Sequence, residues 1–312
     1  MDTTCKVILS GGAGLVGQNL ILSLKRQGYE RIVSIDRSEA GNAVIRKLHP
    51  DVTVIDADLA EPGDWELEFE GARAMVLLQA QISGLEYAQF ARNTLRSTER
   101  VLAAGKRCKV PYAVHISSSV VNSRANDFYS RSKRAQEAMV RESGIRAVIL
   151  RPTLMFGWFD RKHLGWLARF MARVPVFPVP GSGRYIRQPL FEQDFCAVIC
   201  ACLQRELTGE YNISGLERIH YVDLIRMIRE ATGTRTPILK VPYRLFWALV
   251  AIYALFDRNP PFTTQQLEAL VIPEEFEMID WPRIFDVPTT PLSEALRRTF
   301  CEQPYCDVVL PS

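Results

Sequence analysis

Short apolar runs alternate with stretches of helical periodicity through the first half of the chain. The runs predict strands at Val7–Ser10, Ile32–Ile35, Val52–Ile55, Ala74–Leu78, Tyr112–Ile116 and Ala147–Leu150. The periodic stretches predict helices at Gln18–Gln27, Ala40–Leu48, Tyr87–Ala104 and Ser130–Ser143. This alternation indicates parallel strands joined by crossover helices. We therefore expect an α/β protein with a doubly wound parallel sheet (a Rossmann fold), whose ligands bind at the carboxyl ends of the strands.

The pattern loosens after Pro152. It predicts a proline- and glycine-rich loop at Val174–Gly183 and one more strand at Glu210–Ser214. Further helices are predicted at Phe195–Gln204, Val222–Ala231, Arg244–Phe256, Thr264–Leu270 and Pro291–Phe300. We expect residues 1–157, rejoined by about 186–215, to form the dinucleotide-binding domain. Residues 158–185 and 216–312 are expected to form a smaller, mainly helical substrate-binding part.

One apolar run, Leu245 to Phe256, is twelve residues long. A membrane-spanning helix needs roughly 20 apolar residues. We therefore predict a buried helix and no transmembrane segment. The alternative is a helix that lies on a membrane or on a partner protein.

Composition narrows the setting. The 312 residues carry a net charge of +3 without an obvious basic tract, so no nucleic-acid partner is expected. The seven cysteines form no C-x-x-C pair, the four histidines suggest no metal set, and Cys196, Cys200 and Cys202 fall on a helix predicted to be buried. A reduced cytoplasmic protein is expected. Met1–Cys5 leads straight into a strand, so we expect no signal peptide.

The first strand runs into three glycines, Gly11, Gly14 and Gly17. The first permits a tight turn, the second lets the backbone approach a bulky ligand, and the third lets the next helix pack closely on the strand. The N–H groups at the start of that helix suit a pyrophosphate. Asp36 ends the second strand, where a carboxylate can accept hydrogen bonds from a ribose. We predict a dinucleotide site that favours NAD; Arg37 could pair with a 2′-phosphate, so NADP stays open.

Tyr129 and Lys133 are four residues apart on a predicted helix, so both can reach one ligand. A nearby ammonium stabilises a phenolate and is expected to lower the pKa of Tyr129. Ser117–Ser119 follow the fifth strand, where a hydroxyl can donate to a substrate oxygen. Together these residues indicate acid/base chemistry at a carbinol or ketone carbon.

These motifs resemble the extended short-chain dehydrogenase/reductases, the family of nucleotide-sugar epimerases and dehydratases. The resemblance reaches to about residue 230. It implies that Ser119, Tyr129 and Lys133 are catalytic, and that Ser119, Tyr129 and Arg187 contact the substrate. It implies cofactor contacts for Gly11, Gly14, Leu15, Val16, Gly17, Asp36, Arg37, Asp58, Leu59, Gln79, Ala80, Asn93, Ser117 and Lys133. No metal site is implied.

Family dehydratases carry an Asp-Glu pair beside the serine, where this chain has Val120 and Val121, so dehydration is disfavoured. The resemblance then implies epimerisation or 4-keto reduction of a nucleotide sugar, most simply at C4. In an epimerase Tyr129 would take the hydroxyl proton while NAD takes the hydride. A homodimer is also implied, and the apolar helix leaves a peripheral membrane contact open.

Two alternatives remain. The stretch from Val241 through the apolar helix to Leu267 is similar to the tail of non-catalytic subunits of respiratory complexes, which keep the cofactor fold. A hydroxyl dehydrogenase of an apolar, sterol-like or flavonoid-like substrate would share the serine, tyrosine and lysine. Trp158, Trp166 and Phe170 would suit such a substrate or belong to an ordinary core.

Overall fold

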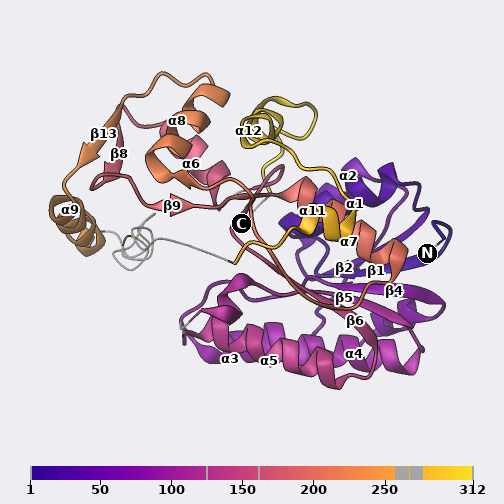
Figure 1. The fold of residues 1–312 in the computed structure, drawn as a ribbon. Helices are drawn as coiled ribbons and strands as arrows, with labels where there is room; N and C mark the ends of the chain where they lie inside the picture. The colour runs from indigo at the N-terminus through magenta and orange to yellow at the C-terminus, as the bar shows by residue number, and fades with distance from the viewer. Residues whose placement is uncertain (1, 124–125, 161, 257–266, 268–276, 311–312) are drawn as a thin grey trace.

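The computed structural model describes residues 2–123, 126–160, 162–256, 267 and 277–310 (Figure 1). At its centre lies a seven-stranded sheet in which all paired neighbours are parallel. Its strands are β1 (Lys6–Ser10), β2 (Arg31–Asp36), β3 (Thr53–Asp56), β4 (Ala72–Leu77), β5 (Tyr112–Ile116), β6 (Arg146–Pro152) and β11 (Gly209–Ile213). The order is β11-β6-β5-β4-β1-β2-β3, so the chain reverses its course beside β1. The predicted doubly wound sheet is confirmed, with each of its seven strands.

Helices cover both faces of this sheet. They are α1 (Leu15–Arg26), α2 (Glu39–Leu48), α3 (Tyr87–Phe90), α4 (Ser97–Arg107), α5 (Phe128–Glu142), α7 (Glu192–Arg205) and α11 (Trp281–Phe285). Because successive side chains of a strand point to opposite faces, Val7 and Leu9 of β1 enter one core and Ile8 enters the other. Figure 1 shows α1, α2, α7 and α11 on one side and α3, α4 and α5 on the other.

The predicted helices of this half are confirmed with small shifts of their ends. The helix predicted at Tyr87–Ala104 forms as α3, a π-helical turn at Ala91–Arg96 and α4. The three cysteines of α7 are buried as predicted.

A further apolar core gathers the segments after Pro152. It includes side chains of α6 (Leu164–Met171), α8 (Tyr221–Ala231) and α12 (Leu292–Cys301). Three two-stranded ladders accompany them: β7 (Met155–Phe156) with β10 (Leu190–Phe191), β9 (Ile186–Arg187) with β12 (Ile219–His220), and β8 (Phe177–Pro180) with β13 (Ile238–Val241). The sequence analysis did not expect α6 or these ladders. It placed β8 in a loop, because the partner that makes it a strand lies about 60 residues further along the chain.

The helix α9 (Tyr243–Phe256) follows β13 at the edge of the molecule (Figure 1). The predicted helix forms, but the prediction that it is buried is wrong. From Tyr243 to Ile252 no side chain is buried, and Leu245, Trp247, Leu249 and Ile252 are 41–55% exposed. No helix in the described part of the chain is long and apolar enough to cross a membrane. The helix predicted at Thr264–Leu270 lies outside the described residues, apart from Leu267.

Candidate functional site

The turn between β1 and α1 requires its glycines. Gly11 has a φ of +81°, and a Cβ there would lie 2.6 Å from the backbone nitrogen of Gln79. A Cβ on Gly17 would lie 2.2 Å from the carbonyl oxygen of Gly12, so this glycine fits the helix against the turn itself rather than against the strand. Gly14 precedes the first residue of α1, and a Cβ there would have only one neighbour, 3.8 Å away. The backbone at Gly14 is therefore open to a ligand.

A cavity of about 500 Å³ opens at the carboxyl ends of the strands, a size typical of small-molecule sites. All the residues predicted to contact the cofactor line it except Lys133, which is buried outside its lining. Ser119 and Tyr129 also line the cavity, whereas Arg187 does not. The fold thus brings the glycine turn, Asp36 and Tyr129 together from distant parts of the sequence.

Asp36 lies at the end of β2 beside this turn. Its Oδ2 accepts from the N–H of Ala13 at 3.1 Å, and its Oδ1 accepts from the N–H of Ser38 at 2.9 Å. Burial raises the pKa of Asp36, while these two N–H groups oppose the rise. A carboxylate has about four acceptor positions, so capacity remains for ribose hydroxyls. Arg37 donates to Asn93 Oδ1 at 2.8 Å, which holds its guanidinium at the same end of the cavity.

Asp58 has a partner that the sequence analysis missed. Arg92 Nη1 lies 2.8 Å from Asp58 Oδ2, and the N–H of Ala60 donates to Oδ1 at 3.0 Å. Burial raises the pKa of Asp58, but the hydrogen bonds from Ala60 and Arg92 outweigh it and hold the pKa below its usual value. Asp58 is therefore ionised and fixed at the cavity wall. In the sequence, the only indication of this ion pair was that Arg92 stands next to Asn93, a residue predicted to contact the cofactor.

The three serines after β5 have different surroundings. Ser117 Oγ donates to Glu137 Oε1 at 2.6 Å. Ser118 lines the cavity as Tyr129 does, and its side chain acts against the rise in the Tyr129 pKa. Ser119 is buried and lines the cavity, and its side chain makes no hydrogen bond to another described residue. Ser118 is therefore a second candidate for the catalytic serine, which the resemblance had placed at Ser119.

Tyr129 lies in the first turn of α5, where the side chain of Asp127 caps the helix by accepting from the N–H of Ser130 at 2.8 Å. Burial raises the pKa of Tyr129, and the side chain of Ser118 opposes the rise. The expected lowering by Lys133 is not found. The Lys133 ammonium donates instead to the carbonyl oxygen of Ile116 at 2.8 Å and is buried.

Gln136 is the second group that holds Lys133. Its Oε1 accepts from Lys133 Nζ at 2.6 Å, and its Nε2 donates to the Gln79 carbonyl oxygen at 3.1 Å and to Thr98 Oγ1 at 2.7 Å. The side chain is fully buried and links the lysine to the cavity wall at Gln79. Burial lowers the pKa of Lys133 to about 7, and Glu137 opposes that change. An ammonium has three donors, so one remains after Ile116 and Gln136. The sequence analysis missed Gln136, although it lies three residues from Lys133.

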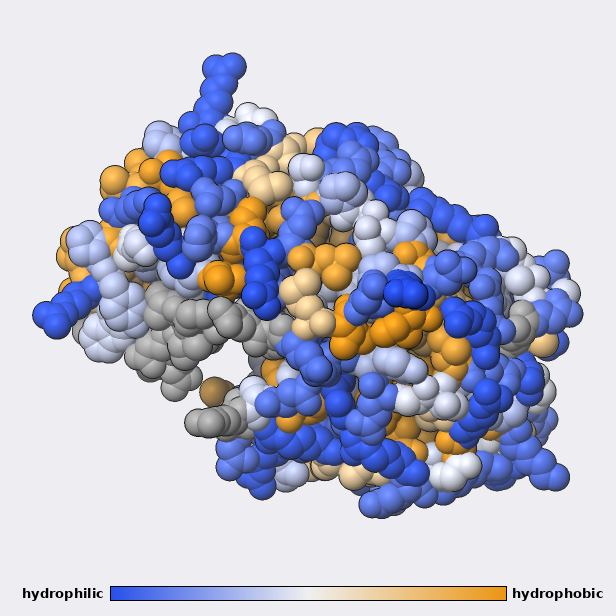
Figure 2. Space-filling model, viewed as in Figure 1, coloured by the Kyte–Doolittle hydropathy of each residue, from blue (hydrophilic) through white to orange (hydrophobic). Residues whose placement is uncertain are grey.

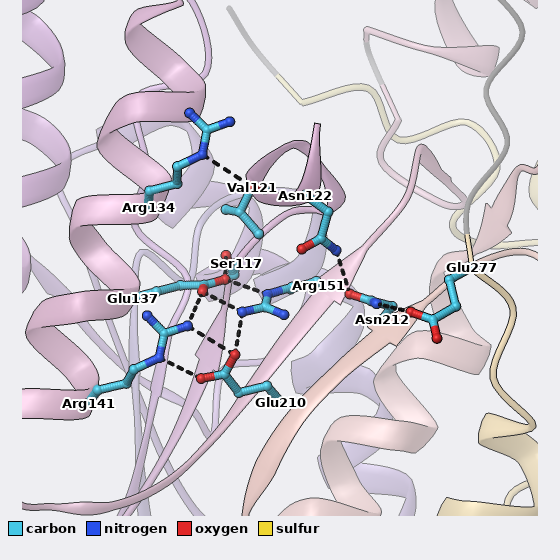
Figure 3. Close-up of polar contacts among 10 residues, drawn as sticks. All are labelled: Ser117, Val121, Asn122, Arg134, Glu137, Arg141, Arg151, Glu210, Asn212 and Glu277. Atoms are coloured by element: carbon cyan, nitrogen blue, oxygen red, sulfur yellow. Dashed lines mark hydrogen bonds and ion pairs between the residues drawn. The ribbon is translucent and has the colours of Figure 1, made fainter. Parts of the chain in front are cut away.

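A buried carboxylate, Glu137, anchors α5 to the sheet (Figure 3). Arg151 of β6 donates two hydrogen bonds to this carboxylate, of 2.8 and 2.7 Å, and Arg141 Nη2 lies 2.6 Å from the same carboxylate. Glu210 of β11 pairs with both arginines. Burial raises the pKa of Glu137, but Arg151 and Ser117 outweigh it and keep the pKa below its usual value. This cluster fixes the position of the helix that carries Tyr129 and Lys133.

Arg187 lies in β9 and is only 4% exposed. Its guanidinium is stacked 5.3 Å from the ring of Tyr185, away from the cavity lining. Trp158 is buried and packs against Tyr305, while Trp166 and Phe170 stack on each other 5.1 Å apart. None of these aromatic side chains lines the cavity; Trp158 belongs to a core cluster, Phe170 packs against another, and Trp166 stacks on Phe170 outside both.

Residues 7–214 match the model of the NAD dependent epimerase/dehydratase family. The chain belongs to this family. It is accordingly an NAD-dependent enzyme, and the expected cofactor NAD is confirmed. Among the described residues no group of His, Cys, Asp and Glu is arranged to hold a metal ion.

The chain is similar to a ceramide reductase of Caulobacter vibrioides, with 25% identity over 77% of this chain and 75% of the relative. It is also similar to a 3 beta-hydroxysteroid dehydrogenase/Delta 5-->4-isomerase of Mycobacterium tuberculosis, with 25% identity over 76% of this chain and 72% of that protein. The structure of UDP-glucuronic acid 4-epimerase from Bacillus cereus in complex with NAD matches with a TM-score of 0.71 and 20% identity. That match covers 94% of this chain and 96% of the epimerase, and it confirms the fold.

Proposed function

We propose that this enzyme transfers a hydride between NAD and a carbinol or ketone carbon, with Tyr129 as the general acid and base. The observation that carries the proposal is one cavity lined by the glycine turn, Asp36, Ser118 and Tyr129, with the Lys133 ammonium held on α5 by Ile116 and Gln136. NAD, when bound, accepts or delivers the hydride. The chain supplies the proton and the positions of both partners.

The state of Tyr129 favours proton donation. Its raised pKa keeps the phenol protonated at neutral pH, so it can donate to a ketone oxygen during reduction. The third donor of Lys133 would then support the phenolate that remains. Ser118 or Ser119 would donate to the same substrate oxygen as charge develops on it.

The adenosine end of the cavity fits the cofactor. We propose that the N–H groups at the start of α1 hold the pyrophosphate and that Asp36 holds the adenosine ribose. Asp58, Leu59 and Asn93 would surround the adenine, and Gln79 and Ala80 would contact the nicotinamide half. Asp36 repels a 2′-phosphate, so NAD is favoured over NADP.

For the substrate we propose an apolar ketone or alcohol. Beside Tyr129 and the serines, the described lining includes Ile82, Val120, Leu154 and Met155. Arg37, at the adenosine end, is the one Lys or Arg among the described residues that line the cavity. A nucleotide sugar carries a diphosphate, which arginines usually bind, and Arg187 lies elsewhere. The ceramide and steroid enzymes named above also act on apolar molecules.

A nucleotide sugar is the second candidate, because the fold matches UDP-glucuronic acid 4-epimerase along almost its whole length. In either case we propose that residues 158–185 and 216–312 form the substrate-binding part. For a nucleotide sugar, the proposed reaction is C4 epimerisation or 4-keto reduction.

Purified protein with added NADH, offered keto lipids, a ketosteroid and UDP-sugars in parallel, tests the proposal. We expect NADH to be consumed with a keto lipid or a ketosteroid. A UDP-sugar converted to an isomer of equal mass would overturn the apolar substrate and support the second candidate. NAD binding without turnover on any substrate would support the non-catalytic alternative.

A further inference from the structure

The helix α9 presents an apolar surface that the described chain does not cover. Leu245, Trp247, Leu249 and Ile252 are each at least 41% exposed, and no side chain from Tyr243 to Ile252 belongs to a core cluster. Leu239 on the preceding strand β13 is also exposed, to 55%. Figure 2 shows hydrophobic side chains in several patches among hydrophilic ones on the face of the molecule in view.

The charges are not dispersed evenly along the chain. Residues 161–191 and 231–256 together contain nine Lys and Arg and no Asp or Glu. The rest of the chain holds 29 Lys and Arg (38 less 9) against 35 Asp and Glu. We call these two stretches the basic region. The net positive charge of the protein therefore comes from this region alone.

The fold joins the two stretches of the basic region. Strand β8 of the first pairs along its length with β13 of the second, and the N–H of Gly181 donates to the Val241 carbonyl oxygen at 2.7 Å where α9 begins. Exposed cations lie on both stretches: Arg173, Arg184, Arg235, Lys240 and Arg244. Within the described residues none of these five forms an ion pair.

We propose that α9 and the basic region dock the enzyme on the surface of an anionic lipid bilayer. An exposed apolar helix, aromatic residues such as Trp247, and neighbouring unpaired cations are the features that bind anionic interfaces. With 14 residues α9 is about 21 Å long, which is too short to span a bilayer. It therefore lies in the interface rather than crossing it.

The same features favour a bilayer over a second copy of this chain as the occupant. An interface with a second copy would have to place the unpaired cations of the basic region against themselves or against acidic groups of the other copy. An anionic bilayer offers acyl chains to the apolar helix and charged headgroups to the cations on one surface. The proposal goes beyond the proposed function and does not depend on the identity of the substrate.

Co-sedimentation of the full chain with vesicles tests the docking. We expect binding to vesicles of phosphatidylcholine with phosphatidylglycerol, weaker binding at high salt, and little binding to phosphatidylcholine alone. The apolar variant, Trp247→Glu with Leu249→Glu, should lose at least about tenfold in binding. Its matched control is Leu67→Glu with Leu85→Glu, which also places two acids at exposed apolar positions, 60% and 95% exposed.

The charge variant, Lys240→Gln with Arg244→Gln, should weaken binding several-fold and reduce its salt dependence. Lys47→Gln with Lys106→Gln removes the same charge at exposed positions elsewhere and should bind as the unmodified chain does. NADH binding, followed by fluorescence, confirms that each variant is folded. Absence of binding by the unmodified chain, or equal losses in variants and controls, would overturn the proposal. A loss of oligomers on gel filtration in the apolar variant alone would overturn it in favour of a second copy.

Discussion

The helices α7 and α9 are both 14 residues long, yet the molecule uses them in opposite ways. The first carries charged residues at its ends but is packed against α1 and the sheet, and its Asp194 accepts two hydrogen bonds from Thr290. The second carries one charged residue, Arg244, and none of its described side chains is buried. Neighbouring elements, rather than the composition of a helix, decide whether its apolar surface is buried.

The same contrast separates the catalytic edge of the sheet from the basic region. At the sheet edge, the ionisable groups Glu137, Arg151 and Lys133 have partners within the chain. In the basic region, Arg173, Arg184, Arg235, Lys240 and Arg244 form no ion pair within the described residues, and no described side chain of α9 is buried. Changes at the sheet edge should therefore alter chemistry and stability in solution but not vesicle binding, and changes in α9 should do the reverse.

Tyr129→Phe should have the largest effect. Removing the proton donor is expected to reduce turnover by about 10²–10⁴-fold, while binding of NADH and of vesicles stays unchanged. Stopped-flow measurement of NADH consumption with the active substrate checks the rate. The matched control is Tyr211→Phe on β11, which removes a hydroxyl that donates to the carbonyl oxygen of Thr208. Full turnover by Tyr129→Phe would disprove the assigned role.

Arg151→Met should come next. It leaves the buried Glu137 carboxylate with only Arg141 and Ser117, so we expect the free energy of unfolding to fall by about 3 kcal/mol. Urea unfolding at neutral pH measures the loss. Because the folded pKa of Glu137 is depressed, the difference from the unmodified chain should shrink as pH falls below about 4.5, through the folded pKa. Arg297→Met, at an exposed pair with Glu294, should change stability little. Equal effects would contradict a buried anchor.

Gln136→Leu should reduce turnover by roughly tenfold, since Lys133 loses an acceptor. The charged lysine then has less support, so its pKa should fall below about 7. Activity that needs the ammonium is lost as pH rises through the pKa of Lys133. The Gln136→Leu variant should therefore lose activity at a lower pH than the unmodified enzyme. The pH profile of kcat/KM measures this shift. Gln136→Glu should stabilise the ammonium form of Lys133, so the loss of activity in the pH profile should move back toward higher pH. An unchanged profile in Gln136→Leu would show that the contact is only structural.

Leu249→Ala should have the smallest effect on stability. Its side chain is 55% exposed, so we expect a change within about 0.5 kcal/mol. Leu203→Ala in α7, at 0% exposure, is the matched comparison and should cost about 2–5 kcal/mol. Urea unfolding of both variants makes the test. A large loss for Leu249→Ala would mean that α9 is covered by this chain.

The seven strands and the position of the cofactor site could be read from the sequence because their signals are local. Short apolar runs predict strands from a few residues, and Gly11, Asp36 and Tyr129 each lie at the end or start of such an element. The roles of Ser118, Gln136 and Arg92 could not be read in this way. Each depends on which side chain meets another across separate elements.

The sequence by itself determined the doubly wound sheet, the glycine turn and the helix that carries Tyr129 and Lys133, because periodicity and glycine geometry act over a few residues. The tertiary structure alone decided that no described side chain of α9 is buried, that β8 is a strand and that the ammonium of Lys133 is held by Gln136. Burial, strand pairing and the pKa of a side chain depend on neighbours that are distant in the chain. Only the folded arrangement supplies those neighbours.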